Sequence, residues 1–347
     1  MEKIDIAVVG ASGMVGGELL GLLEQRNFPV GQLFPFSSGK RDSFIKFKGE
    51  SIKCHAPSIE ELKKARLVFF VSMDEVSAAF ARKLAEAGSI CIDDSSYYRL
   101  AEDVPLCIPE VNGASLKNFF KGKKKGNKRG MLIAGPNCTI TGAAVSLAEI
   151  HRKYGIRELR ISSYQAVCGA GRDAMLQMEK EVKHYASTGE FPKEKGVFPR
   201  PIAFNLFPQV GGFDSEGFCS EERKVSAELK KILNAPSMKV SSTTVRVPVL
   251  RGHSLAIWAA TEKTWTIADL ECSLEKTPGL KFFRKPEEYP SPLEYGTRTD
   301  IVYAGRLRAA ETGKNEFQLW TVSDNLYKGA ALNSVQIAEY LADNGLL

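Results

Sequence analysis

The sequence predicts an α/β protein whose first part is a doubly wound parallel sheet. Short, almost continuous apolar runs, such as Ile4–Val9 and Met131–Ala134, are typical of strands covered on both faces. Stretches with helical spacing lie between these runs, and glycines stand at the strand-to-helix turns. Strands that alternate with helices in this way over residues 1–137 form an open parallel sheet.

Length and composition indicate how many domains the chain can form and which classes of protein are excluded. The chain has 347 residues, 44% of them hydrophobic, which is long enough for two domains. We expect no membrane span and no signal peptide, because the apolar segments are short and the N-terminal residues run straight into a strand. The seven cysteines are scattered without a Cys-x-x-Cys pair, which disfavours a disulfide framework and a metal site and favours a reducing cytoplasm.

One local run accounts for the net charge of +6. Residues 117–129 hold seven basic side chains and no acidic one: Lys117, Lys121, Lys123, Lys124, Lys125, Lys128 and Arg129. The run is rich in Gly and Asn. A solvated surface loop explains it better than a polyanion site, so we expect no nucleic-acid partner.

A glycine-rich turn follows the first strand. Residues 10–16 read Gly-Ala-Ser-Gly-Met-Val-Gly, and a helical stretch through Leu19 and Leu23 comes next. Glycines at such a turn allow close approach of a pyrophosphate, and the helix N-terminus supplies amide donors. This predicts a Rossmann-type dinucleotide site rather than a merely tight turn, with contacts from Gly10, Ala11, Ser12, Gly13, Met14 and Val15.

The end of the second strand, residues 32–36, bears on the choice of dinucleotide. An acid in this place holds the ribose 2′-hydroxyl of NAD. Here the chain has two hydroxyls and two cations instead, from Ser37, Ser38, Lys40 and Arg41, and Asp42 comes only after them. These groups suit a 2′-phosphate and favour NADP; a basic surface turn is the alternative.

Two further strands lead to a loop with a candidate anion ligand. Residues 67–71 form a buried strand ending at Ser72, residues 76–87 a helix, and residues 90–94 another strand. The loop 95–99 lies beyond its carboxyl end, at the edge where open α/β sheets bind ligands. Arg99 in this loop could bind an anion or be solvated.

Cys138 lies where a strand gives way to a helix. The strand Met131–Ala134 is broken by Gly135 and Pro136, and residues 140–154 have helical spacing. Unpaired amides and the positive end of the helix dipole would favour a thiolate there. The alternative is a small buried cysteine.

The second half of the chain mixes strands and helices. Residues 159–167 predict a strand with Gln165 near its end, then a glycine-rich turn at 168–171. Residues 172–187 predict a helix whose core face holds Met175, Met178, Val182 and Tyr185, and residues 188–220 an irregular connection.

Three candidate site residues follow the irregular connection. In the helix 220–233, Glu221 and Lys224 share a face, which alone suggests a surface ion pair. Arg246 lies in the strand 240–249. His253 stands at a bend before the strand 255–260, where it could be catalytic or simply buried. A helix at 266–274, a strand at 317–322 and a capped last helix at 329–344 complete the chain.

Several segments together resemble the aspartate-β-semialdehyde dehydrogenase family. They are residues 10–16, 135–139, 163–167, 246–249 with His253 seven residues after Arg246, and 323–331; residues 103–106 and 109–112 also fit. The resemblance runs nearly from end to end, and the combination is specific although no single motif is. It implies reversible reductive dephosphorylation of aspartyl β-phosphate to aspartate β-semialdehyde with NADPH, in the biosynthesis of lysine and diaminopimelate, threonine and methionine.

The resemblance also implies roles for individual residues. Cys138 matches the nucleophile that forms a thioester, and His253 the general acid/base. Gln165 would orient the substrate, Arg246 would bind its α-carboxylate and Glu221 its amino group. Phosphate would be held by Arg99, Asn137 and Lys224, and the cofactor would also contact Ser72, Cys168, Gly169 and Asn325.

The same resemblance implies the domain plan. Residues 1–137 would form a dinucleotide-binding domain completed by residues 326–347, whose helix returns to it. Residues 138–325 would form an α+β domain for catalysis and dimerisation, and its sheet would join two subunits of a homodimer or homotetramer. Cys168 departs from the serine expected in the glycine turn and would weaken a hydrogen bond to the cofactor, and residues 117–129 resemble an insertion.

Two other readings stay open. N-acetyl-glutamyl-phosphate reductase shares the domain plan and the cysteine chemistry, but it would need room for an acetyl group where Glu221 and Lys224 suit a free amine. A non-catalytic paralogue could keep the fold and NADP binding, yet this chain retains Cys138, Gln165, Arg246 and His253 together.

Overall fold

The computed structural model describes residues 2–40, 42–122 and 130–347, and the chain divides into two compact units. The first comprises Met1–Asn137 and Gly329–Leu347, and the second Cys138–Lys328. The predicted α/β class is confirmed in both. Within the described ranges, no helix is long and apolar enough to cross a bilayer.

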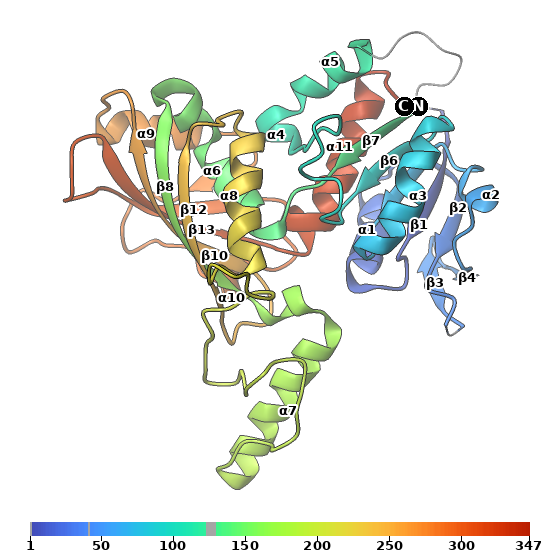
Figure 1. The fold of residues 1–347 in the computed structure, drawn as a ribbon, viewed down its shortest axis with the longest axis horizontal. Helices are drawn as coiled ribbons and strands as arrows, with labels where there is room; N and C mark the ends of the chain where they lie inside the picture. Colours follow the sequence, from blue (N-terminus) through green and yellow to red (C-terminus); the bar gives the residue numbers. More distant parts are fainter. Residues whose placement is uncertain (1, 41, 123–129) are drawn as a thin grey trace. The chain divides into compact units, whose positions relative to one another are not determined.

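A parallel five-stranded sheet forms the centre of the first unit (Figure 1). Its strand order is β2-β1-β5-β6-β7, with bounds β1 Ile4–Val9, β2 Val30–Phe36, β5 Leu67–Phe70, β6 Ile90–Asp93 and β7 Met131–Ala134. The chain leaves β1 toward one edge and β5 toward the other. Because such crossovers are right-handed, α1 (Met14–Gln25) and α3 (Asp74–Glu86) cover opposite faces. Ligands of such a sheet bind at the carboxyl ends of its strands.

The last helix of the chain, α11 (Leu332–Asp343), belongs to this first unit and packs against α1. Arg26 and Glu339 join the two helices by a bidentate ion pair, with Nε–Oε1 at 2.7 Å and Nη2–Oε2 at 2.9 Å. A π-helical turn, Tyr327–Ala331, precedes α11. The helix expected at residues 329–344 is therefore present.

Several short elements of the first unit were not expected from the sequence. They are the hairpin β3 (Phe44–Phe47) and β4 (Glu50–Lys53), and the helices α2 (Ile59–Leu62), α4 (Pro109–Asn112) and α5 (Ala114–Gly122). Helix α5 corrects the interpretation of the basic run as a loop, because residues 117–122 are helical. The remainder of that run, residues 123–129, lies outside the described residues.

A mixed six-stranded sheet forms the second unit. Its order is β11-β12-β13-β10-β8-β9, with bounds β8 Ile156–Gln165, β9 Lys239–Arg246, β10 His253–Thr261, β11 Leu280–Phe282, β12 Val302–Ala309 and β13 Glu316–Ser323. The helices α6 (Cys138–Tyr154), α8 (Ser220–Ile232) and α9 (Ile267–Glu275) pack together on one face (Figure 1). A short helix, α10 (Pro292–Tyr295), packs against β13.

Helix α7 (Arg172–Thr188) extends away from this sheet, joined to it through the 3-10 turn η1 (Val167–Ala170) (Figure 1). The prediction of which α7 side chains are buried is only partly confirmed. Met178 is buried, but Val182 and Tyr185 are 40% and 41% exposed. Glu181 is buried instead, because its carboxylate accepts hydrogen bonds from the N–H groups of Ile202 (2.8 Å) and Ala203 (2.9 Å) in the irregular segment.

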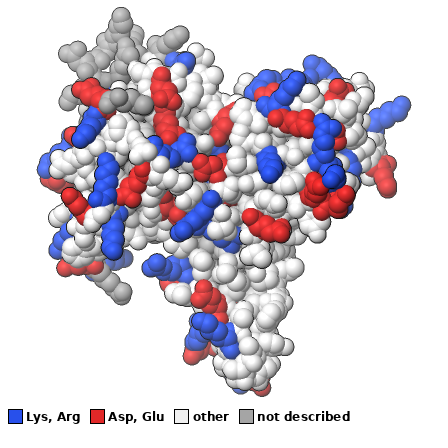
Figure 2. Space-filling model, turned by 180° about the vertical axis from the view of Figure 1, so that it is seen from behind, with Lys and Arg blue, Asp and Glu red and all other residues white. Residues whose placement is uncertain are grey.

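The surface carries both signs of charge. Figure 2 shows Lys and Arg interspersed with Asp and Glu on the face it presents, without a continuous basic area there. Elsewhere in the described residues, ion pairs such as Arg223–Asp214 and Arg284–Glu275 also join opposite charges.

Candidate active site

A cysteine and a histidine meet in the second unit. Cys138 is the first residue of α6, and His253 is the first residue of β10. Cys138 Sγ lies 3.5 Å from His253 Nε2 although the residues are 115 positions apart in the chain. Cys138 therefore lies at a helix N-terminus, where the positive end of the helix dipole favours the thiolate.

The ring of His253 is held on its other side as well. Nδ1 accepts a hydrogen bond of 3.1 Å from the N–H of Ala166, which follows β8. The side chain is 1% exposed. Burial, and next the positive charge of Arg246, hold the pKa of His253 well below its usual range. The sequence placed His253 at a bend; the structure makes it the buried start of a strand.

Gln165 and Arg246 are register neighbours on the parallel strands β8 and β9, where both strands end. Both side chains are buried. Arg246 Nη1 donates to the carbonyl oxygen of Ala166 at 2.5 Å. Burial lowers the pKa of Arg246, and its interactions with Cys138, Glu221 and Cys168 oppose this shift. A parallel pair of strands therefore presents a guanidinium and an amide side by side.

Glu221 completes this cluster from α8. Its Oε1 accepts hydrogen bonds from Gln165 Nε2 and from Thr139 Oγ1, each at 3.1 Å, and the residue is 8% exposed. The interpretation of Glu221 as a surface charge is therefore wrong; Lys224, one turn later, is half-buried. Thr139 was not singled out as a site residue in the sequence, although its position beside Cys138 was the available signal.

A second set of contacts holds the turn that carries His253. Asn325 Oδ1 accepts from the N–H of Gly252 (3.0 Å) and from the Cys168 thiol (3.2 Å). Asp324 is fully buried, and its carboxylate binds Arg251 with Nε at 3.0 and 2.9 Å. Asp324 also accepts from the N–H of Leu326 and of Tyr327. The expectation that these residues cap the last helix is wrong, because α11 begins at Leu332 without a side-chain cap; Asp324 binds the backbone just before the π-helical turn instead. Its buried arginine partner was not foreseen.

Gly169 shows how closely the turn after β8 approaches these groups. A Cβ built on Gly169 would lie 3.1 Å from Arg246 Nη1 and 3.4 Å from His253 Cε1. Any side chain would therefore press on both groups. Burial raises the pKa of the neighbouring Cys168 thiol, which keeps it in its protonated, hydrogen-bonding form.

In the first unit, the loop after β6 holds Arg99 buried, with Nη2 donating to the carbonyl oxygen of Asp94 at 2.7 Å. The solvated alternative for Arg99 is wrong. Asp94 accepts a hydrogen bond of 2.6 Å from Ser334 Oγ, and burial raises its pKa to about 7. Asn137, at the end of the first stretch of this unit, is buried too.

The glycine turn of the first unit fits a nicotinamide dinucleotide. Residues 10–13 connect β1 to α1, which begins at Met14 with Val15 next, and within this described turn no side chain caps the helix. A Cβ at Gly16 would lie 2.3 Å from the carbonyl oxygen of Gly10, so only glycine permits this approach. Ser72 Oγ, after β5, is buried without a hydrogen-bond partner among the described residues.

The groups expected at the 2′-position follow β2 directly. Ser37 is buried and accepts a hydrogen bond from Ser43 Oγ, whereas Ser38 and Lys40 are exposed. Arg41 lies outside the described residues. Asp42 pairs with Lys53 at 3.0 Å. This ion pair lies at the surface, since the Asp42 side chain is 76% exposed.

Comparison with known proteins agrees with this geometry. The family model "Semialdehyde dehydrogenase, NAD binding domain" matches residues 5–119, and "Semialdehyde dehydrogenase, dimerisation domain" matches residues 147–328. A Rossmann-type turn in one unit and a cysteine–histidine pair in the other define the chain as a semialdehyde dehydrogenase, an oxidoreductase with a nicotinamide-binding domain.

Individual relatives identify the family within this class of dehydrogenases. Aspartate-semialdehyde dehydrogenases of Shewanella violacea and Aquifex aeolicus are 37% and 38% identical, with 98% and 99% of each chain covered. The crystal structure of aspartate semialdehyde dehydrogenase II from Vibrio cholerae superimposes with a TM-score of 0.90 at 34% identity, covering 99% of both chains. A second structure of that enzyme is complexed with ASA. The chain belongs to the aspartate-semialdehyde dehydrogenase family, which serves amino-acid biosynthesis.

Proposed function

We propose that this chain reduces aspartyl β-phosphate to aspartate β-semialdehyde with NADPH, reversibly, through a thioester on Cys138. The observation that carries the proposal is the 3.5 Å approach of His253 Nε2 to Cys138 Sγ at the N-terminus of α6. A thiolate there attacks the acyl carbon, a C–S bond forms and phosphate leaves. A nicotinamide dinucleotide held by the glycine turn would supply the hydride that reduces the thioester. The C–S bond then breaks and the aldehyde is released.

The substrate's polar groups match the cluster around the sulfur. The guanidinium of Arg246 can bind the α-carboxylate through two parallel hydrogen bonds, and the Glu221 carboxylate can accept from the α-ammonium. The Gln165 amide lies against Glu221 and can orient the acyl group. Arg99, Asn137 and Lys224 are proposed for the phosphate on the basis of the family resemblance.

NADP is proposed in preference to NAD. The support is the hydroxyl and cationic groups after β2 (Ser37, Ser38, Lys40 and Arg41) and the pairing of Asp42 with Lys53. Gly10, Ala11, Ser12, Gly13, Met14 and Val15 would hold the pyrophosphate, and Ser72 offers an unused hydroxyl. Gly169 and Asn325 keep the cofactor roles that the resemblance implies. Cys168 does as well, although its thiol bonds to Asn325.

We also propose a homodimer joined through the sheet of the second unit. The support is the description of the matching family model and a groove of about 540 Å³ on the sheet, lined by Trp258, Tyr289 and Trp320. A Cβ built on Gly142 of α6 would contact the side chain of Thr321 on β13. Because side chains alternate along a strand, the preceding residue, Trp320, points to the other face of the sheet. That face lies away from α6, and its groove combines aromatic side chains with polar ones such as Gln318 and Arg308.

Turnover with two aldehydes tests the substrate. We expect phosphate-dependent reduction of NADP with aspartate semialdehyde and none with the N-acetylated five-carbon aldehyde. Turnover with the acetylated aldehyde alone would instead identify an N-acetyl-glutamyl-phosphate reductase. A kcat/KM for NAD equal to that for NADP would contradict the cofactor assignment.

A further inference from the structure

Two hydrogen-bond donors converge on one carboxylate oxygen near Cys138. Oε1 of Glu221 accepts from Thr139 Oγ1 and from Gln165 Nε2, each at 3.1 Å. Thr139 lies in the first turn of α6, directly after the cysteine, whereas Gln165 is the last residue of β8. Donors from two different elements therefore fix the direction in which the Glu221 carboxylate points.

Burial makes these two contacts difficult to replace. Thr139 and Gln165 are each 2% exposed, and Glu221 is 8% exposed. Water has little access to this oxygen, so the loss of one donor would leave the carboxylate less well satisfied than in the native protein. Hydrogen bonds to a charged group also contribute more than those between neutral groups.

Other contacts hold the backbone of α8 at this point. The carboxylate of Glu222 accepts from the N–H groups of Cys219 (2.9 Å) and Thr244 (3.1 Å), and Cys219 Sγ lies 3.0 Å from Thr244 Oγ1. These contacts join the start of α8 to β9 without Thr139. Removing the Thr139 hydroxyl should therefore release the side chain of Glu221 and leave the helix in place.

We propose that Thr139 is a positioning residue that directs Glu221 toward the α-ammonium group of the substrate and thereby makes the site selective for substrates with an amine. The inference rests on the proposed function, in which Glu221 accepts from that ammonium. Because Thr139 follows Cys138 directly, one turn of α6 carries the reacting sulfur and also orients the carboxylate that recognises the amine. A substrate that lacks the amine would gain nothing from this contact.

Thr139→Val tests this role because valine has nearly the shape of threonine and lacks the hydroxyl. We expect the KM for aspartate semialdehyde to rise about tenfold or more, with a smaller change in kcat, since a hydrogen bond to a charged group is worth roughly this factor. The Ki of 4-oxobutanoate, which is the same aldehyde without the amine, should stay as in the wild type. Thr139→Ser restores a hydroxyl and should recover most of the wild-type KM.

Two further measurements separate positioning from a general structural effect. The rate at which iodoacetamide alkylates Cys138 should be the same in Thr139→Val and the wild type, because the sulfur is not moved. The control variant is Ser146→Ala, which removes a buried hydroxyl of the same helix that donates to the carbonyl oxygen of Gly142 at 2.7 Å, and its KM should be unchanged. Equal weakening of both ligands in Thr139→Val, slower alkylation or an unchanged KM for aspartate semialdehyde would overturn the proposal.

A double-mutant cycle shows whether Thr139 acts through Glu221. In the Glu221→Gln background, Thr139→Val should lower kcat/KM for aspartate semialdehyde far less than it does alone, because its partner is already impaired. Independent, multiplicative effects of the two substitutions would contradict the positioning role. Absence of wild-type turnover with aspartate semialdehyde would refute the proposed function and this inference with it, whereas normal turnover with multiplicative effects would refute the role of Thr139 alone.

Discussion

At the scale of single residues, the proposed reaction gives Cys138 and Arg246 separable functions. The sulfur would form and break a covalent bond, whereas the guanidinium would only bind the substrate. Both residues act on His253: the sulfur lies 3.5 Å from its Nε2, and the charge of Arg246 helps to lower its pKa. Substitutions at these two positions should therefore change different kinetic constants.

Replacing Cys138 by serine should lower kcat by roughly three or more orders of magnitude, because a neutral hydroxyl is a far weaker nucleophile than a thiolate. The binding of NADPH, followed by its fluorescence, should persist. The matched control is Cys272→Ser, which changes a half-buried cysteine on α9 outside the site. Retained turnover in Cys138→Ser would refute the thioester.

Replacing Arg246 by lysine should raise KM for aspartate semialdehyde about tenfold or more, with a smaller change in kcat. An ammonium cannot make two parallel hydrogen bonds to a carboxylate, and one charge-assisted bond is worth about 1.5–3 kcal/mol. Steady-state kinetics measure the split. Arg284→Lys is the control, since Arg284 is an exposed arginine that pairs with Glu275 at 2.6 Å outside the site. An unchanged KM in Arg246→Lys would argue against carboxylate binding.

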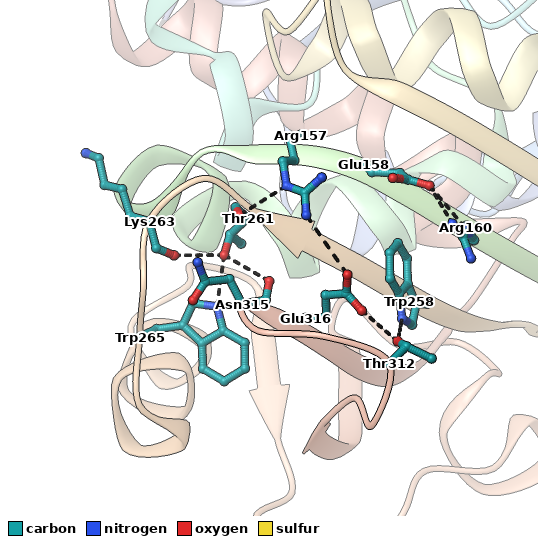
Figure 3. A network of polar contacts seen from close by, with 10 residues as sticks. All are labelled: Arg157, Glu158, Arg160, Trp258, Thr261, Lys263, Trp265, Thr312, Asn315 and Glu316. Atoms are coloured by element: carbon teal, nitrogen blue, oxygen red, sulfur yellow. Dashed lines mark hydrogen bonds and ion pairs between the residues drawn. The ribbon is translucent and has the colours of Figure 1, made fainter.

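At the scale of elements, strand β10 connects the site to a separate structural network. His253 is its first residue and Thr261 its last, about 26 Å apart at the usual rise per residue. Figure 3 shows that Thr261 lies at the centre of contacts with Lys263, Trp265 and Asn315. Its Oγ1 accepts from Trp265 Nε1 at 2.9 Å and lies 2.9 Å from the carbonyl oxygen of Lys263.

Thr261→Val should therefore reduce the free energy of unfolding by about 1–3 kcal/mol, since it leaves buried polar partners unsatisfied. Urea unfolding measures the change. The kcat should stay as in the wild type because the substitution lies at the far end of the strand. Thr264→Val, at an exposed position, is the control and should leave stability within about 0.5 kcal/mol. Equal stability of the two variants would show that the network contributes little.

At the scale of the whole molecule, stability should depend on the pH through Asp94. Its pKa is raised to about 7 by burial, so the folded chain binds a proton that the unfolded chain releases near pH 4. Stability is then greatest below about pH 4 from this group and falls as the pH rises toward 7. Asp94→Asn should remove this loss, on the order of 1–4 kcal/mol. Thermal unfolding of both proteins from pH 5 to 8 measures it; parallel curves would contradict the assignment.

The proposed dimer is also a property of the whole molecule, and the groove on the second sheet is its expected interface. Tyr289 is 54% exposed and lines the groove on the second sheet. Placing a charge there, in Tyr289→Arg, should desolvate an arginine in the proposed interface and convert the dimer to a monomer of 38.1 kDa. Light scattering measures the mass. Phe44→Arg, at a 61% exposed position on β3, is the control. A mass unaffected by Tyr289→Arg would place the interface elsewhere.

Local patterns in the sequence were sufficient to predict most of the first sheet and the turns at its strand ends. Apolar runs marked the strands β1, β5, β6 and β7 of the first sheet, and a glycine turn and a strand-to-helix break located the dinucleotide turn and Cys138. These features depend on neighbours in the chain, because strand burial and helix initiation follow from periodicity and capping over a few residues. The buried face of α7 was assigned incorrectly because it depends on contacts with a distant segment. The N–H groups of residues 202–203 bind the carboxylate of Glu181 there.

The amino-acid sequence by itself determined the class of fold, the position of Cys138 at a strand-to-helix turn and the family. Only the tertiary structure decided that Glu221 is buried against Gln165, that Asp324 binds Arg251 and that Ala166 donates to His253. Each of these contacts joins residues far apart in the chain. Their existence depends on strand register and helix packing, which bring the groups within hydrogen-bonding distance and remove the water that would otherwise bind them.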